Sequence, residues 1–320
     1  RKVLVDAMSK NVTMLSGRKG LKDNLFERIV QAGTPEASAH MQIAKAYLMG
    51  EAVTYGAASF YDLLSEKNAG KKALVCDGSA CLCAGTQPDV RSKLESRFQP
   101  DEVGTITCLG RCHENAAFHV NGCNYSGQDL DHLDDILGES PRPAGDSYAV
   151  ASTFAEPMLT APIDSLDNFY GLLRDLLDVQ PDALLATLKA SGLRGRGGAG
   201  FPTGVKWDAA RNAPADKRYI IANADEGDPG AYIDRYVMEA QPHRMLFGML
   251  VAGRIVGADE GVVYLRAEYP ESIAAVKQAI ADIEAAGFAG EAICGSDFSF
   301  TFKVVAGAGA YICGEETALI

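Results

Sequence analysis

Two pairs of closely spaced cysteines constrain the first half of this chain more than any other feature. Four residues separate Cys76 from Cys81, and three residues separate Cys108 from Cys112. Each pair lies at the end of a short apolar run that predicts a β-strand. Because neighbouring strands can bring their end loops together, we expect the four thiols to converge on one site.

A site of four thiolates suits iron or zinc, since both metals take four soft sulfur ligands. We favour a [2Fe–2S] cluster, because a cluster is larger than a zinc ion and tolerates the wider loop between Cys76 and Cys81. A zinc site is one alternative. The other is a set of buried cysteines that pack as small apolar side chains.

The chain divides into two parts by its patterns of apolar residues. Residues 21–66 carry apolar residues at helical spacing, and a small α/β pattern follows. Its predicted elements, in the order β-α-β-β-α, are residues 73–76, 87–98, 103–108, 116–120 and 130–137. Gly, Pro and Ser gather immediately afterwards, which is typical of a linker. We therefore expect a first domain at residues 1–137, a linker at 138–146 and a second domain at 147–320.

The second part alternates strands with long helices. Predicted helices cover residues 166–177, 181–190, 243–257 and 270–286, and predicted strands cover residues 218–223, 261–266 and 298–304. Strands separated by helices of this length form βαβ units, which build a parallel sheet. The expected fold class is therefore α/β in both parts, with a parallel sheet in the second.

A glycine-rich stretch, GLRGRGGAGFPTGVKW, occupies residues 192–207. It contains G-x-G-x-x-G, but a predicted helix precedes it where the dinucleotide-binding fingerprint needs a strand, so we do not assign it to that motif. Its bare backbone still favours a phosphate-bearing or flat-ring ligand, because N–H groups can approach such a ligand closely. Nearby cations are Arg194, Arg196 and Lys206. A solvated surface loop is the alternative.

Two further segments directly follow predicted strands. They are NADEGDPG at residues 223–230 and GAGAYICGEE at residues 307–316. Parallel sheets bind ligands at the carboxyl ends of their strands, so we expect both segments to meet the glycine-rich stretch there. The alternatives are a solvated acidic loop for the first segment and, for the second, a helix start with acidic residues favoured by the helix dipole.

Composition excludes several classes of partner. The chain has 42 acidic and 30 Lys or Arg residues, a net charge of −12, which argues against binding to nucleic acid or anionic membranes. No apolar run reaches the roughly 18 residues of a membrane span, since the best one, residues 245–253, ends at Arg254. Eight cysteines are too sparse for a disulfide scaffold. We expect a soluble, cytoplasmic protein without direct membrane insertion.

The cysteine region resembles the 24-kDa-type subunit of NADH dehydrogenases. The resemblance rests on VCDGSAC at residues 75–81, CLGRC at 108–112 and YGAASFYDLL at 55–64. It implies a helical segment followed by a thioredoxin-like domain with one [2Fe–2S] cluster. Its ligands would be Cys76, Cys81, Cys108 and Cys112. The 26 residues between Cys81 and Cys108 are fewer than the family usually has, and a missing hairpin would explain this without affecting the ligands.

Residues 177–320 are similar to the 51-kDa-type flavoprotein subunit of the same enzymes, because all three glycine-containing segments match in order. The resemblance implies an FMN site at Gly195, Arg196, Gly197, Lys206, Asn223, Asp225, Glu226, Tyr311, Gly314 and Glu315. It implies NAD(H) contacts at Phe201, Asp228 and Glu316. Asp228 stands where the family often has Glu, and Gly227 where some members have Ser. No side chain needs to act as a nucleophile, since the flavin carries the hydride chemistry.

Fusion of both modules in one chain resembles the diaphorase subunits of NAD-linked formate dehydrogenases and NAD-reducing hydrogenases. The resemblance implies hydride transfer between NAD(H) and FMN, single-electron transfer to iron–sulfur clusters, and other redox subunits as partners. The family's flavoprotein also holds a [4Fe–4S] cluster with C-x2-C-x2-C ligands, which we expect only in a continuation beyond residue 320. The alternatives are a flavoprotein subunit of NADH-quinone oxidoreductase and a non-catalytic iron–sulfur docking module.

Overall fold

The structure is a computed structural model, and it describes residues 24–33, 37–138, 145, 150–196, 198–315 and 319. Contacts between Cα atoms divide the chain into two compact units. Unit 1 comprises residues 1–146, 227–230 and 308–313, and unit 2 comprises residues 147–226, 231–307 and 314–320. Two short segments of the second half therefore belong to the unit that holds the cysteine pairs. Most of the predicted linker at 138–146 lies outside the described residues.

The described part of unit 1 opens with three short helices, α2 (Leu25–Ala32), α3 (Ala37–Ala46) and α4 (Glu51–Phe60). The helical stretch predicted to reach residue 66 ends at Phe60. The backbone after Phe60 pairs with a distant segment and does not continue the helix. The N–H groups of Asp62 and Leu63 donate to the carbonyls of Gly309 and Ala308 at 2.7 and 3.1 Å. This pairing ties the end of the helical segment to residues 308–313 within unit 1.

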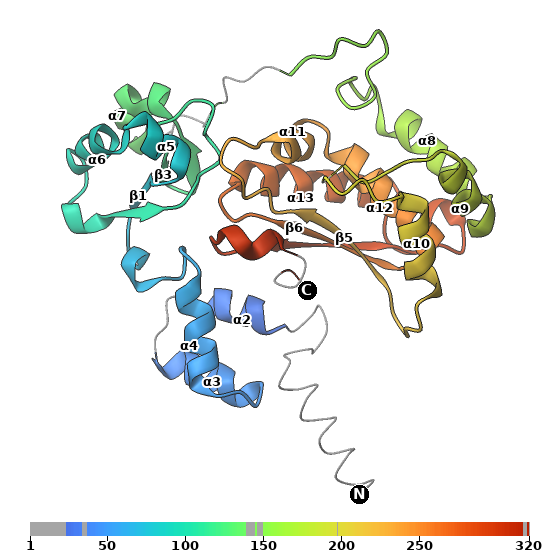
Figure 1. Ribbon diagram of the computed structural model, residues 1–320, viewed down its shortest axis with the longest axis horizontal. Helices are drawn as coiled ribbons and strands as arrows, with labels where there is room; N and C mark the ends of the chain where they lie inside the picture. The colour runs from blue at the N-terminus through green and yellow to red at the C-terminus, as the bar shows by residue number, and fades with distance from the viewer. Residues whose placement is uncertain are drawn as a thin grey trace, which may run out of the picture. The chain divides into compact units, whose positions relative to one another are not determined.

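The rest of unit 1 is a small four-stranded α/β domain (Figure 1). Its elements are β1 (Ala73–Cys76), α5 (Ser79–Ala84), α6 (Gln87–Glu95), β2 (Val103–Ile106), β3 (Phe118–Val120), β4 (Cys123–Tyr125) and α7 (Leu133–Leu137). The strand order is β2-β1-β3-β4, with β2 parallel to β1 and the other pairs antiparallel. The predicted β-α-β-β-α order is confirmed, and α5 and β4 are additional elements. Asn121 and Gly122, both at positive φ, form the two-residue turn between β3 and β4.

Unit 2 contains the predicted parallel sheet (Figure 1). Its strands are β5 (Tyr219–Ala224), β6 (Glu260–Leu265) and β7 (Thr301–Ala306), in the order β5-β6-β7 and all parallel. Its helices are α8 (Leu166–Leu177), α9 (Pro181–Ala190), α10 (Thr203–Asn212), α11 (Ile233–Ala240), α12 (Pro242–Val256) and α13 (Pro270–Ala285). The apolar patterns in the sequence did not predict α10 and α11. The core packs Leu250 of α12 and Val276 of α13 against Val263 and Leu265 of β6.

The last predicted strand needs one correction. Strand β7 begins at Thr301, because Phe300 forms an isolated antiparallel bridge with Gly290 and does not join the parallel ladder. A 3-10 turn covers Tyr311–Gly314, and Leu319 is the one residue after Glu315 that the structure describes. Among the described residues, no helix is both long and apolar enough to cross a membrane.

Candidate functional site

The four cysteines predicted as cluster ligands lie together in unit 1, at the ends of β1 and β2. Cys76 ends β1, and Cys81 lies in α5 with its thiol hydrogen-bonded to that of Cys76. The sulfurs of Cys108 and Cys112 are 3.5 Å apart. Cys81 interacts electrostatically with both Cys108 and Cys112. The structure therefore brings the four thiols together as two neighbouring pairs.

The backbone around the cysteines turns sharply and donates hydrogen bonds to their sulfurs. Cys108 adopts φ 56° and Gly110 φ 72°, so the loop after β2 turns sharply at both residues. A Cβ on Gly78 would lie 3.0 Å from the backbone nitrogen of Cys108, so the two ligand loops touch there. Backbone groups of Leu109, Ala117 and Gly230 hydrogen-bond to Cys76, Cys81 and Cys112 respectively.

Hydrogen bonds between the thiols shift their pKa values in opposite directions. The hydrogen bond from Cys76 lowers the pKa of Cys81 to about 6, and the same bond raises the pKa of Cys76. The hydrogen bond to Cys108 and burial raise the pKa of Cys112. Thiolates are the form that binds metal, and Cys81 is the thiol whose lowered pKa favours that form.

The donor set fits a [2Fe–2S] cluster. Four sulfurs in two pairs, with backbone hydrogen bonds to sulfur, match a dinuclear cluster in which each iron takes two thiolates. Among the described residues, no three His, Cys, Asp or Glu side chains surround one position suited to a single metal ion.

The second candidate site lies at the carboxyl edge of the parallel sheet in unit 2. Ala224, Leu265 and Ala306 pair across the three strands, so Asp225, Arg266 and Gly307 follow at one edge. The side-chain amide of Asn223 donates to the carbonyl of Gly314 at 2.7 Å. A Cβ on Gly314 would lie 2.6 Å from the carbonyl oxygen of Asp225. The ends of the segments after β5 and β7 therefore meet there, as predicted.

Asp225 is the most unusual group at this edge. Its Oδ1 is buried and has no hydrogen-bond partner among the described residues. Burial raises the pKa of Asp225 to about 7, although the nearby Arg266 opposes the shift and Glu268 adds to it. Gly307 and Gly314 flank the carboxyl with bare backbone. A buried acceptor beside glycine backbone fits a ligand that donates a hydrogen bond to Asp225, and a flavin carries such donors on its ring and its ribityl chain.

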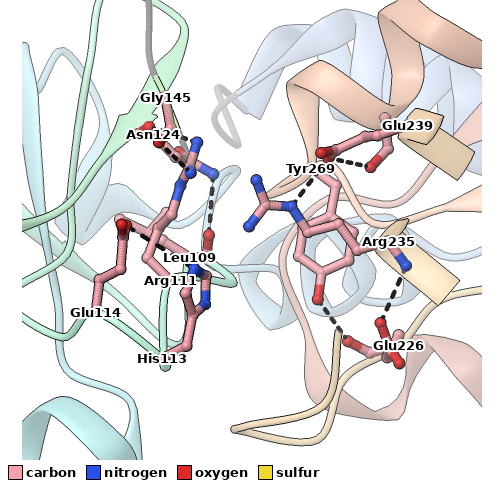
Figure 2. A network of polar contacts seen from close by, with 11 residues as sticks. Leu109, Arg111, His113, Glu114, Asn124, Gly145, Glu226, Arg235, Glu239 and Tyr269 are labelled. Atoms are coloured by element: carbon pink, nitrogen blue, oxygen red, sulfur yellow. Dashed lines mark hydrogen bonds and ion pairs between the residues drawn. The ribbon is translucent and has the colours of Figure 1, made fainter. Parts of the chain in front are cut away.

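Glu226, the next residue, has a different environment. Its carboxylate accepts the backbone N–H groups of Ile233, Asp234 and Arg235 at 2.9, 3.2 and 3.2 Å, which caps the start of α11. Figure 2 shows the bond from Arg235 to Glu226. Its carbonyl accepts hydrogen bonds from Arg266 and Tyr269. The carboxylate expected at the flavin therefore has three backbone partners of its own.

Arg266 and Glu268 are site residues that the sequence analysis missed. They form an ion pair at 3.0 Å, and both side chains are only 3% exposed. Arg266 directly follows β6, so the argument used for the segments after β5 and β7 also applies to it. The signal was available in YLRAE, the end of a predicted strand followed by two charges.

Tyr311 and Asp228 meet within unit 1. The hydroxyl of Tyr311 donates to Oδ1 of Asp228, and this bond raises the pKa of Tyr311. A Cβ on Gly227 would lie 3.1 Å from the carbonyl oxygen of Tyr311. The residue implied for flavin and the residue implied for NAD(H) are therefore in direct contact.

The glycine-rich stretch forms a closed loop between α9 and α10. The N–H of Gly195 donates to the carbonyl of Phe201, and the guanidinium of Arg194 donates to the carbonyl of Gly200, both at 2.9 Å. A helix precedes the loop, which confirms that it is not an ordinary dinucleotide-binding fingerprint. Its described hydrogen bonds join residues of the loop itself, and none of them reaches the segments after β5 and β7.

The remaining predicted residues are exposed or lie outside the description. Arg196, Phe201, Lys206 and Glu315 have exposed side chains, and Phe201 is 54% exposed. Gly197 and Glu316 lie outside the described residues.

Comparisons with known proteins assign both halves. Residues 29–140 match the family model of the thioredoxin-like [2Fe-2S] ferredoxin, and residues 188–320 match that of the Nuo51 FMN-binding domain. One part of the chain thus matches a ferredoxin family and the other an FMN-binding family. The cysteine pairs fall in the ferredoxin domain, and the sheet edge falls in the FMN-binding domain.

Relatives and solved structures agree with this assignment. The chain is 48% identical over 162 residues to the NADP-reducing hydrogenase subunit HndC of Solidesulfovibrio fructosivorans, covering 49% of this chain and 33% of that protein. It is 46% identical over 143 residues to the mitochondrial NADH-ubiquinone oxidoreductase 51 kDa subunit of Neurospora crassa, covering 43% and 29%. An NAD+-reducing [NiFe]-hydrogenase in the H2-reduced state aligns at TM-score 0.69 and 27% identity, covering 92% of this chain and 53% of that chain. The chain thus matches less than half the length of these two curated relatives.

Proposed function

We propose that this chain is the electron-entry part of an NAD-linked redox enzyme. FMN, when bound, exchanges a hydride with NAD(H) and releases electrons one at a time. The chain's own residues hold the flavin at the sheet edge and hold a [2Fe–2S] cluster between the cysteine pairs. The activity belongs to a longer protein or complex, since this chain matches only part of each relative.

One observation carries this proposal. Residues 225–230 start at the carboxyl edge of the parallel sheet, where the flavin would bind, and end beside Cys112, a proposed cluster ligand. Asp225 lies at the sheet edge, and Gly230 hydrogen-bonds to Cys112. Five peptide units join Asp225 to Gly230, and an extended chain of that length spans at most about 18 Å. Whatever arrangement the two units adopt, the chain itself limits the separation of these two residues.

The exposed groups of the glycine-rich loop suit the charged parts of the ligands. Arg196 and Lys206 are exposed cations in the glycine-rich stretch, where the flavin phosphate would bind. The exposed ring of Phe201 would stack on a ring of NAD(H). In a chain of net charge −12 these cations supply the local attraction that an anionic dinucleotide needs.

The partner reaction that the observations favour is hydrogen oxidation. Both domains align within one chain of the hydrogenase structure, which covers 92% of this chain. We infer that the natural partners are iron–sulfur subunits and a hydrogen-activating or formate-activating subunit. We place the chain in a reducing compartment such as the cytoplasm, which would keep the four ligand thiols available to iron.

The test is NADH oxidation by the purified chain, loaded anaerobically with FMN, iron and sulfide, with ferricyanide as electron acceptor. We expect Lys206→Ala to weaken FMN binding at least tenfold. Lys277→Ala, which removes an exposed lysine from α13 in the same unit, should leave FMN binding unchanged. A chain that retains FMN and oxidises neither NADH nor NADPH would refute the proposal.

A further inference from the structure

Two buried side chains donate hydrogen bonds to one backbone carbonyl at the edge of the parallel sheet. Nη1 of Arg266 donates to the carbonyl of Glu226 at 2.8 Å. The hydroxyl of Tyr269 donates to the same oxygen at 3.3 Å (Figure 2). Glu226 directly follows Asp225, whose Oδ1 is buried at the proposed flavin site. The two donors therefore fix the peptide unit next to the residue that would accept a hydrogen bond from the flavin.

Arg266 is itself held in place by the residues around it. It is 3% exposed, and its Nη2 donates to Oε1 of Glu268 at 3.0 Å. Its guanidinium carbon lies 5.0 Å from the centre of the Tyr269 ring, within the range of a cation–π contact. The backbone N–H of Tyr269 donates to the carbonyl of Arg266 at 3.2 Å. Both donors thus belong to one bonded turn between β6 and α13.

Helices α11 and α13 support the tyrosine. The guanidinium carbon of Arg235, in α11, lies 5.7 Å from the centre of the Tyr269 ring. Oε1 of Glu239 accepts a hydrogen bond from Nε of Arg235 at 2.9 Å (Figure 2). The same oxygen accepts a hydrogen bond from the hydroxyl of Ser272, in α13, at 2.8 Å. Because these groups are packed and bonded, the Tyr269 hydroxyl has little freedom to turn away from Glu226.

Arg266 also acts on Asp225 by its charge. Two charged groups shift the pKa of Asp225: Arg266 lowers it and Glu268 raises it, and the effect of Arg266 is the larger. Gly307 and Gly314, which follow β7, approach the carboxyl with bare backbone. An ionised carboxylate accepts hydrogen bonds more strongly than the neutral acid does. Arg266 therefore favours the form of Asp225 that accepts.

We propose that Arg266 and Tyr269 are positioning residues of the flavin site, which hold Asp225 ready to accept a hydrogen bond by fixing the carbonyl of Glu226. The inference rests on the flavin site assigned under the proposed function. Neither residue needs to touch the flavin, because both act through the segment after β5. A ligand that binds a preordered segment loses less free energy to ordering it. Loss of either donor should therefore weaken FMN binding.

The test is fluorescence titration of FMN with the full flavin-free chain at several pH values. Tyr269→Phe removes one hydroxyl and keeps the ring. We expect this variant to bind FMN about threefold to tenfold more weakly, the range of one hydrogen bond. The wild-type affinity should rise as the pH passes through about 7, where Asp225 ionises, and Tyr269→Phe should keep this profile.

A double variant tests the arginine. Arg266→Met with Glu268→Gln removes both charges of the ion pair, so no unpaired carboxylate is left buried. We expect FMN binding at least about tenfold weaker, since hydrogen bonds from charged donors are the stronger ones. The rise in affinity should move to higher pH, because the larger of the two effects on Asp225 is lost. Arg266→Lys keeps the charge and should restore the wild-type pH profile. Arg174→Met, in α8 with 55% of its side chain exposed, is the control and should change neither affinity nor profile.

The outcomes separate this inference from the proposed function. A wild-type chain that binds no FMN would refute the proposed function. Wild-type FMN affinity in both Tyr269→Phe and the double variant would refute only the positioning role. A wild-type pH profile in the double variant would refute the action of Arg266 on Asp225. If urea unfolding shows that the double variant does not fold, Tyr269→Phe decides, and wild-type FMN affinity in that variant overturns the inference.

Discussion

Gly314 lies against the backbone of Asp225, so closely that a Cβ on Gly314 would come within 2.6 Å of the Asp225 carbonyl oxygen. Asn223 reinforces the contact with its hydrogen bond to the Gly314 carbonyl. Asn223 and Gly314 are 91 residues apart in the sequence, and the segments that hold them meet at this point. The approach needs a residue without a side chain, which explains a glycine at position 314 by sterics.

Gly314→Ala should therefore disrupt the sheet edge. The clash is with backbone, which cannot turn aside as a flexible side chain can, so we expect at least tenfold weaker FMN binding, measured by fluorescence titration. Gly248→Ala is the matched control, because this exposed glycine of α12 has open space around it. It should leave FMN affinity unchanged and stabilise the helix by about 0.5–1 kcal/mol. Equal FMN affinities for both variants would contradict the account of the edge.

Asp225 should make the stability of the flavin-free protein depend on pH. Its pKa is about 7 in the folded chain, against a usual value of about 3.9 in the unfolded chain. The folded state thus keeps a proton that the unfolded state has lost, and stability from this group is present below about pH 4 and is lost as the pH rises to about 7.

Asp225→Asn should remove that dependence, since the amide does not titrate. Urea unfolding at about pH 5 and about pH 8 measures the effect, and the advantage of Asp225→Asn over wild type should grow with pH. Parallel pH profiles for the two proteins would show that Asp225 is ionised in the folded chain across this range.

Cys81→Ser should abolish the cluster, because it removes the thiol with the lowered pKa from the four-sulfur set. Iron and acid-labile sulfide, measured after anaerobic reconstitution, should fall to background. Cys83→Ser, two residues further along the chain and exposed, should retain both at wild-type levels. Loss of iron from both variants would argue against the assignment of Cys81 as a ligand.

Glu226→Ala should act on stability even without flavin. It removes the carboxylate that accepts three backbone N–H groups at the start of α11, which costs about 1–2 kcal/mol in the free energy of unfolding. Urea unfolding of the flavin-free protein measures the loss. Glu284→Ala, at an exposed position of α13, is the control and should change stability little. An unchanged stability for Glu226→Ala, with weaker FMN binding, would instead favour a direct flavin contact.

The helix capped by Glu226 also shows where prediction from sequence ended. The start of α11 is fixed by a carboxylate seven residues earlier in the chain, and no local pattern at Ile233 carries that information. Helix α10 was missed because Gly204 interrupts its first turn, and tertiary packing against the backbone of Lys189 requires that glycine. Strand β4 was predictable, since Asn121-Gly122 is a standard two-residue hairpin turn.

The candidate sites were predictable to the extent that short sequence segments carry them. Regular alternation of strands and helices predicted the parallel sheet, and the sheet edge then followed for Asn223, Asp225 and Gly314. The burial of Asp225 and Arg266 was not predictable, because it depends on contacts between residues far apart in the sequence. Charged residues in the sequence show only that a charge exists, and packing decides how strongly that charge acts.

The measurement that tests the central claim most directly is reduction of the loaded chain by excess NADH without oxygen, followed by flavin absorbance and electron paramagnetic resonance. The account predicts that the flavin band bleaches and the signal of a reduced [2Fe–2S] cluster appears. In Cys81→Ser the flavin should still bleach and the cluster signal should be absent. A flavin that stays oxidised in the presence of NADH would contradict the account. A second result would also contradict the account: NADH bleaches the flavin of the wild-type chain but gives no cluster signal, although dithionite reduces the cluster in the same chain.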